Sequence, residues 1–284
     1  MEIEVEDSQG FFRDNPPARG SSLKVRFGYS DRIRDGGVFY IDSYTYHSNP
    51  SGDRFTIKAL AKDVKKSFRE VKTQGFENTT LKRIAEDIAK RHNYRIDFKG
   101  DDIAFRRLTQ NQKRDLQFLA DLCNLYGYTC KVSNKTIVIR SLSERLSSKE
   151  IYTLTRDVIK EFSVDVSSLY ESGIEVVYLD PEKKAVTEDR KTASIKSSGS
   201  TKKENIRVED KRQAEAISNA QKKLNEMKEI QARAVCIGIP EMYAGGKIEL
   251  QGFGRFDRIY YISSVTHRIT RNGYETELKL LKGG

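Results

Sequence analysis

Apolar and polar side chains alternate along the first part of the chain. In residues 23–29 and 54–60 every second side chain is apolar or aromatic. A period of two residues is typical of β-strands that bury one face. Residues 34–37 end in two glycines and predict a hairpin between such strands. We therefore expect residues 1–75 to form part of a first, antiparallel β-barrel module.

The period changes in the next segment. Apolar side chains recur three and four positions apart, as on one face of an α-helix, at Leu81, Ile84, Ala85, Ile88 and Ala89. Thr80 precedes them and is a favourable N-cap. A second helix is expected over residues 111–125, ended by Gly127. Strands are expected over residues 94–98, 128–132 and 136–140. Residues 76–143 therefore predict an α+β insertion of helix, strand, helix and hairpin.

Three segments complete the chain. Residues 144–180 return to strand patterns. Residues 181–210 are rich in serine and lysine, so apolar burial cannot offset an ordering cost of about 1–2 kcal/mol per residue. We expect a flexible basic loop there, cleaved early by trypsin at Lys191, Lys196 or Lys202. Residues 211–284 combine a helix with short β-runs separated by glycine, proline and asparagine, and predict a second β-barrel module. The expected fold is mainly β, with two small β-barrel-like modules and an α+β insertion.

The helix expected over residues 211–229 has a narrow apolar stripe. Its members are Ala216, Ile217, Ala220, Leu224, Met227 and Ile230. A stripe this narrow cannot bury a whole helix, but its small residues permit close approach to another surface. We expect the helix to pack on the second β module or on a neighbouring subunit, with Lys222, Lys223 and Glu226 facing water. Its interface candidates are Ile217, Leu224 and Met227.

The composition is that of a polar but folded protein. Charged residues make up 32% of the 284 residues and hydrophobic residues 37%, and 14 tyrosines and 13 phenylalanines remain to build cores. No apolar run approaches the ~18–20 residues of a membrane span, and the acidic N-terminus is unlike a signal peptide. Cys123, Cys130 and Cys236 have no disulfide or metal-site spacing, which favours synthesis in a reducing compartment.

The histidines and carboxylates suggest no catalytic site. His47, His92 and His267 lie far apart, and no nucleophile motif accompanies them. We expect His92 at the surface and His267 in a structural role. Two adjacent carboxylate pairs, Asp101 with Asp102 and Glu86 with Asp87, cannot face one another across a cleft as glycosidase acids do. The glycines of residues 245–246 and 252–254 suit hairpin tips. We therefore expect no enzyme activity, cofactor or metal.

Several short motifs follow one another in a fixed order along the chain. They are residues 80–89, 112–119, 126–128, 238–240, 244–246, 252–257 and 260–262, followed by His267 and residues 273–276. In this order they resemble the phage late control gene D family, the hub proteins of contractile tails, and the similar hub module of VgrG spikes in type VI secretion. Family members usually have further strand sequence before the position of Ile3, which this chain lacks, so we expect its N-terminal strands to be incomplete. VgrG proteins also have a long needle extension, which is absent here, so we expect a hub alone.

The resemblance implies a structural role. It implies a homotrimer whose paired β modules form a ring of six, adapting a six-fold tail tube to a three-fold central spike. The implied partners are the spike protein, the tail tube or tube-initiator protein and other baseplate proteins, with DNA or cargo only passing through the channel. The implied location is the baseplate of a virion or phage-tail-like particle, made in the bacterial cytoplasm.

Two other functions remain open at this point. A peptidoglycan-degrading tail enzyme would require convergent acids or a metal site. The net charge of +10 would suit a basic nucleic-acid-binding adaptor. However, the excess is spread over residues 62–72, 82–95 and 183–212, and no nucleic-acid-binding fingerprint accompanies it. A solvated basic surface explains the charge without such a partner.

Overall fold

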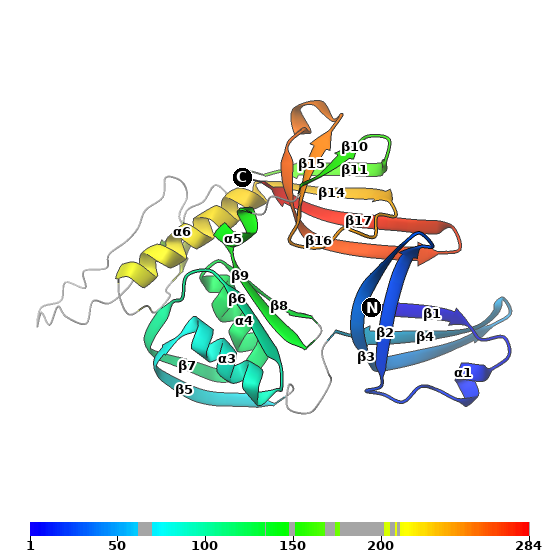
Figure 1. Cartoon of the computed structure of the whole chain (residues 1–284), viewed down its shortest axis with the longest axis horizontal. Coiled ribbons are helices and arrows are strands. Elements are labelled where there is room, and N and C mark those ends of the chain that lie inside the picture. Colours follow the sequence, from blue (N-terminus) through cyan, green and yellow to red (C-terminus); the bar gives the residue numbers. More distant parts are fainter. Residues whose placement is uncertain are drawn as a thin grey trace, which may run out of the picture.

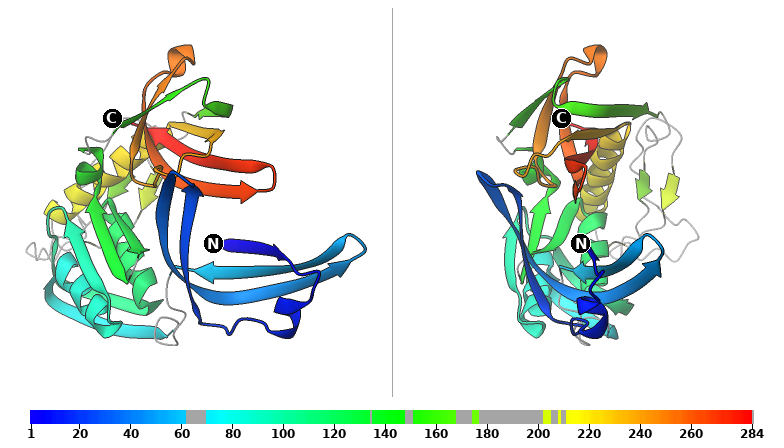
Figure 2. Two further views of the ribbon diagram at one scale, coloured as in Figure 1. Left: turned by 45° about the vertical axis from the view of Figure 1, so that its right-hand side comes forward. Right: turned by 90° about the vertical axis from the view of Figure 1, so that its right-hand side faces the viewer.

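The computed structural model describes residues 1–61, 70–133, 135–147, 151–167, 174–176, 202–204, 208 and 211–283. Figures 1 and 2 show three parts, which are a first sheet, an α+β part and a second, curled sheet. This arrangement confirms the expected fold class, mainly β with two barrel-like β modules and an α+β part. The expected flexible loop of residues 181–210, with Lys191 and Lys196, lies outside the described residues except for residues 202–204 and 208.

The first sheet is antiparallel, in the order β1-β4-β3-β2. Its strands are β1 (Glu2–Glu6), β2 (Ser22–Tyr29), β3 (Arg32–Asn49) and β4 (Gly52–Leu60). The hairpin expected at residues 34–37 is wrong: β3 runs through this segment, and Gly37 pairs with Val25 beside a register shift. The glycines accommodate an irregularity in a long strand, and the chain reverses earlier, between β2 and β3.

The two faces of the first sheet differ in polarity. One face carries Ile3 opposite Ile57 and Val5 opposite Phe55. Its fully buried core is small, Ile41, Phe55 and Ile57, supplemented by Phe12 from the short helix α1 (Phe11–Asp14). The other face carries the glutamates of β1, of which Glu4 lies 3.4 Å from Arg54. The period of two thus separates an apolar from a charged face, as the sequence predicts.

The α+β part contains two small sheets and three helices. Its strands are β5 (Val71–Thr80), paired with β7 (Ala104–Arg114), and β6 (Arg95–Lys99), β9 (Thr136–Ser141) and β8 (Tyr128–Ser133). Its helices are α3 (Leu81–Arg91), α4 (Asp115–Leu125) and α5 (Leu142–Leu146). The N-cap is confirmed, since the Thr80 hydroxyl accepts the backbone N–H of Arg83 at 3.2 Å. The second helix begins at Asp115 rather than at residue 111, because β7 continues to Arg114.

The second sheet has the order β10-β15-β16-β17-β14-β11. Its strands are β10 (Ile151–Thr155), β11 (Ile159–Val166), β14 (Ile230–Ile237), β15 (Lys247–Gln251), β16 (Ile259–Thr270) and β17 (Gly273–Lys282). A 3-10 turn, η2 (Gly254–Phe256), precedes β16. The sheet curls around an apolar core that includes Leu250, Tyr260 and Leu278. Two short strands, β12 (Ile174–Val176) and β13 (Lys202–Glu204), pair separately in parallel.

Helix α6 (Lys211–Lys228) joins the α+β part to the second sheet. Near its N-terminal end, Ala214 and Ile217 are buried in the core of the α+β part. Near its C-terminal end, Met227 packs with Tyr261 of β16 and Leu142 of α5. The helix therefore bridges two units.

Candidate functional site

The first and second sheets contact one another at a place that we call the module junction. The β2–β3 hairpin approaches the β16–β17 hairpin there, as Figures 1 and 2 show. The junction consists of Phe27, Tyr29, Arg34, the loop of residues 238–246, His267 and Tyr274. Four of the motifs that carry the family resemblance come together here: residues 238–240, residues 244–246, His267 and residues 273–276.

Aromatic rings form the centre of the module junction. The rings of Phe27 and His267 are 4.6 Å apart between centroids, and those of Tyr29 and Tyr274 are 5.5 Å apart. Both distances lie in the ~4.5–7 Å range in which aromatic rings attract one another. The first sheet thus contributes two rings that pack on two rings of the second.

The hydrogen bonds of His267 define its tautomer. Nε2 lies 3.2 Å from the carbonyl oxygen of Met242, and Nδ1 lies 2.8 Å from the hydroxyl of Tyr274. A carbonyl oxygen only accepts, so Nε2 carries the hydrogen and Nδ1 of the neutral ring accepts from Tyr274. Burial lowers the pKa of His267; the bond to Met242 opposes this, and the positive charge of Arg34 lowers the pKa further. Burial and the charge of Arg34 therefore favour the neutral ring.

The position of Tyr274 explains Gly238. A Cβ at residue 238 would lie 2.2 Å from Cδ1 of the Tyr274 ring, so only glycine lets the ring approach the loop. Beside it, the backbone N–H of Ile239 donates to the hydroxyl of the buried Thr276 at 2.8 Å. The loop and β17 are thereby fixed to one another at the point where the first sheet docks.

Two cations from other units bind the same loop. Arg34 of the first sheet donates to the carbonyl oxygens of Pro240 at 3.3 Å and Glu241 at 2.6 Å. Lys131 of β8 donates to the carbonyl oxygen of Ala244 at 2.6 Å. The loop of residues 238–246 is therefore the place where all three units meet.

The sequence does not reveal these two cations. Arg34 and Pro240 are 206 positions apart, and a lone arginine within an alternating strand has no local signal of a distant partner. The glycine, proline, histidine and tyrosine of the junction do stand out in the sequence, because their residue types are needed by the local backbone and packing.

One family model matches most of the chain. It is described as the Alg8 N-terminal domain, and it matches residues 18–271, which include every module-junction residue except Tyr274. The chain belongs to this family. The comparison with curated proteins finds no match to this chain. The resemblance of the chain to the late control gene D family stays a prediction.

The chain shares its fold with tail proteins of known structure. A 43 kDa tail protein of a Shewanella oneidensis prophage has a TM-score of 0.72 at 16% identity, covering 99% of this chain and 89% of that chain. A tail protein of Neisseria meningitidis has a TM-score of 0.73 at 13% identity, covering 100% of this chain and 87% of that chain.

A third similar structure comes from E. coli and is a component of the type VI secretion system. Its TM-score is 0.58 at 15% identity, covering 91% of this chain and 63% of that chain. That protein is itself described as structurally similar to bacteriophage tail proteins. At these identities the likeness concerns the fold.

The interface candidates on α6 are buried to different depths. Ile217 is fully buried against the α+β part, and Met227 is buried beside Tyr261. Leu224 is half-buried in the same cluster as Met227. Ala216, expected in the apolar stripe, is exposed, because the buried face of α6 contains Gln213, Ala214 and Ile217 instead. Lys222, Lys223 and Glu226 are exposed, as predicted.

His92 is not at the surface, contrary to expectation. Its side chain is 1% exposed, and its Nε2 lies 2.9 Å from Asp115, which is equally buried. Burial alone would raise the pKa of Asp115, but hydrogen bonds from Gln110 and His92 and the nearby charges of Arg91 and Lys72 lower it. This cluster fixes the start of α4 against the end of α3. No local sequence pattern predicts this cluster, because its members come from four separate segments.

Two of the carboxylates considered as catalytic acids, Asp102 and Glu86, have structural partners, and so has Asp257. Asp102 accepts the backbone N–H of Lys82 at 3.0 Å, and Glu86 lies 4.0 Å from Lys82. Asp257 accepts the backbone N–H groups of Gly252 at 3.1 Å and Phe253 at 2.7 Å, which holds the turn before β16. In the described part of the chain, no three His, Cys, Asp or Glu side chains are arranged to hold a metal ion.

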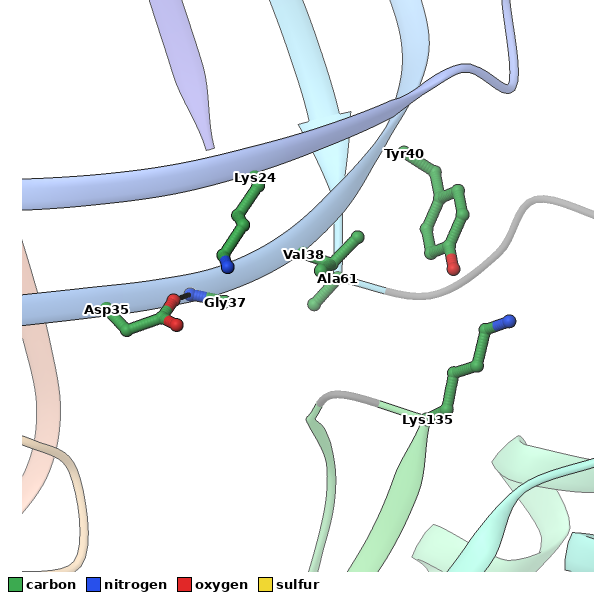
Figure 3. Close-up of a pocket in the computed structure, with 7 residues that line it drawn as sticks. All are labelled: Lys24, Asp35, Gly37, Val38, Tyr40, Ala61 and Lys135. Carbon is green, nitrogen blue, oxygen red and sulfur yellow. Dashed lines mark hydrogen bonds between the residues drawn. The ribbon is translucent and has the colours of Figure 1, made fainter.

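A depression of about 310 Å³ lies between the first sheet and the β8–β9 turn. It is lined by Lys24, Asp35, Gly37, Val38, Tyr40, Ala61 and Lys135. Figure 3 shows Lys24 and Asp35 on one side and Tyr40 and Lys135 on the other. The Asp35 carboxylate already accepts the backbone N–H of Gly37 at 2.8 Å. These lining residues contain no pair of carboxylates and no nucleophile with its base.

The helices give no sign of membrane insertion. Among those in the described residues, none combines the length and apolar content that crossing a bilayer requires.

Proposed function

We propose that this chain is a structural hub of a contractile injection system, such as a prophage tail, a tailocin or a related particle. One observation carries the proposal: the fold follows those of two bacterial tail proteins over 99% and 100% of this chain, at TM-scores of 0.72 and 0.73. The similarity to a type VI secretion component supports the same class of machine.

The proposed role is that of a trimeric adaptor in the baseplate. Three copies, each with two β modules, would place six modules around an axis and so connect a six-fold tail tube to a three-fold central spike. A first sheet with one charged and one apolar face supports this, because its charged face suits a hydrated channel. The module junction would fix the two modules of each copy at the angle that the ring requires.

Copy number in the particle tests the proposal. Particles are purified by sedimentation from cells that carry the gene, and the chain is quantified against the spike protein by mass spectrometry. We expect the chain in the particle, in a one-to-one ratio with the chains of a three-fold spike. Absence from particles, or a strict dimer in the hub–spike complex, would contradict the role.

An Arg34→Ala variant makes this test specific to the structure. It removes both bonds from the first sheet to the loop of residues 238–246 and should reduce incorporation into particles. Lys24→Ala is the matched control, since Lys24 is an exposed cation on the neighbouring strand and should leave incorporation unchanged.

We also propose that the chain breaks no bond. The partners of Asp102, Glu86 and Asp257, which are backbone N–H groups and a lysine, support a structural use of these carboxylates. Purified chain is incubated with peptidoglycan, and release of soluble fragments is followed. Saturable turnover that one carboxylate substitution abolishes would overturn this part. A gel shift with DNA that weakens steeply with salt would favour a nucleic-acid adaptor instead.

A further inference from the structure

His267 lies where the first sheet touches the second, and both of its ring nitrogens are in use. Nε2 donates to the carbonyl oxygen of Met242, and Nδ1 accepts from the hydroxyl of Tyr274. The Phe27 ring of the first sheet packs on the imidazole at 4.6 Å. We propose that His267 makes the module junction an acid-sensitive latch, whose protonation releases the first sheet from the second.

Protonation changes the hydrogen bonds at this position. An imidazolium carries a hydrogen on both nitrogens, so Nδ1 becomes a donor. The hydroxyl of Tyr274 then has to rotate and accept, and it loses its own acceptor. Tyr274 is also the ring on which Tyr29 of the first sheet packs, at 5.5 Å. A change at Nδ1 therefore acts directly on the contact between Tyr274 and Tyr29, which joins the two sheets.

The guanidinium of Arg34 opposes a second positive charge at the imidazole. The titratable and charged groups that face His267 and Tyr274 are Arg34 of β3, Tyr29 of β2, Tyr274 of β17 and Glu241 of the loop. The guanidinium of Arg34 is tied to the carbonyl oxygens of Pro240 and Glu241 and cannot turn away without losing them. Repulsion from an imidazolium therefore acts on the residue that holds the first sheet to the loop.

The direction of the pH effect follows from burial. Burial lowers the pKa of His267 below its ordinary value of 6.5, and the charge of Arg34 lowers it further. Release of the first sheet removes Arg34 and the Phe27 ring from the imidazole and so raises the pKa toward that value. Docking is therefore at full strength above pH 6.5 and weakens as the pH falls below it. Each unit by which docking lowers the pKa weakens docking about tenfold once the pH is below both values.

The other histidines do not face this contact. His47 is exposed on the β3–β4 hairpin, and His92 is bonded to Asp115 within the α+β part. An exposed ion pair between Arg271 and Glu6 also links the second sheet to the first, but exposed pairs add little. The module junction therefore depends mainly on the contacts around His267 and Arg34.

Electron–electron distance measurements on the full chain test the latch. Spin labels are placed at Ser48→Cys and Glu249→Cys, exposed positions on the two sheets, with Cys130→Ala to remove a partly accessible native thiol. Distances are recorded at about pH 7.5 and about pH 5, on either side of the ordinary histidine value. We expect one narrow distance at the higher pH and a growing fraction of longer distances at the lower pH.

Three variants separate the latch from other acid effects. His267→Gln offers an amide donor for Met242 and a carbonyl acceptor for Tyr274 but does not titrate, so it should keep the narrow distance at both pH values. His47→Gln and His92→Gln should open like the parent. An unchanged parent, equal opening in His267→Gln, or loss of far-UV circular dichroism together with opening would each overturn the proposal.

Discussion

A methyl group at residue 238 tests the packing of the module junction. In Gly238→Ala, the new Cβ would lie 2.2 Å from Cδ1 and 2.3 Å from Cγ of Tyr274, closer than side-chain atoms approach. The Tyr274 ring must move, which disturbs its bond to His267 and its contact with Tyr29. Overpacking of this kind costs about 1–3 kcal/mol. The lower backbone entropy of alanine in the unfolded chain offsets about 0.4–1 kcal/mol. We expect a net loss of about 1–2 kcal/mol.

A double-mutant cycle isolates the cause. Urea unfolding followed by circular dichroism gives the free energy of unfolding for the parent, Gly238→Ala, Tyr274→Ala and the double variant. The three atoms nearest to the added methyl group all belong to the Tyr274 ring, so Gly238→Ala should cost less in the Tyr274→Ala background. Gly75→Ala is the matched control, because a Cβ there meets no atom within 4 Å. An equal cost of Gly238→Ala with and without the Tyr274 ring would refute the argument.

Three further predictions concern the α+β part and α6. Ile217→Ala should lower the free energy of unfolding by about 2–4 kcal/mol, since the side chain is fully buried, whereas Ala216→Ser on the exposed side should change it by less than ~0.5 kcal/mol, as measured by urea unfolding. Thr80→Ala should cost about 1 kcal/mol by removing the N-cap of α3, and hydrogen exchange in the first turn of α3 should rise. Because the pKa of Asp115 is lowered from 3.8, its contribution to stability is complete above that value and is lost as the pH falls. An acid titration of Asp115→Asn should therefore lose less stability below about pH 4 than the parent does.

Local sequence patterns predicted the elements that local chemistry determines. The α3 helix follows from the three-and-four spacing of its apolar residues and from Thr80, and the structure places both as expected. Gly127 ends α4 with a φ of 75°, a conformation that glycine adopts without strain. In such cases the residues that decide the outcome lie within one or two turns of each other.

The errors have a common physical origin in contacts distant along the chain. Residues 111–114 are polar and precede an apolar helix, so they read as its first turn, but pairing with β5 keeps them in β7. His92 comes after a basic helix and is expected at the surface, but its side chain is buried because it binds the buried Asp115. Ala216 sits at helical spacing, but the neighbours of α6 cover the face that contains Gln213 and Ala214. Periodicity shows that a face is buried somewhere, and tertiary packing decides which one.

The distance along the chain between Arg34 and its carbonyl partners has a consequence for synthesis on the ribosome. These partners, at Pro240 and Glu241, are made 206 and 207 residues after the arginine. At about 5–20 residues per second, the first sheet waits roughly 10–40 s for the loop that will bind it. During that time its small core and α1 are its main internal support, and Phe27 and Tyr29 lack the rings on which they later pack. Chains made from mRNAs that end before codon 238 contain the whole first sheet but lack this loop. We therefore expect such chains to depend on chaperones.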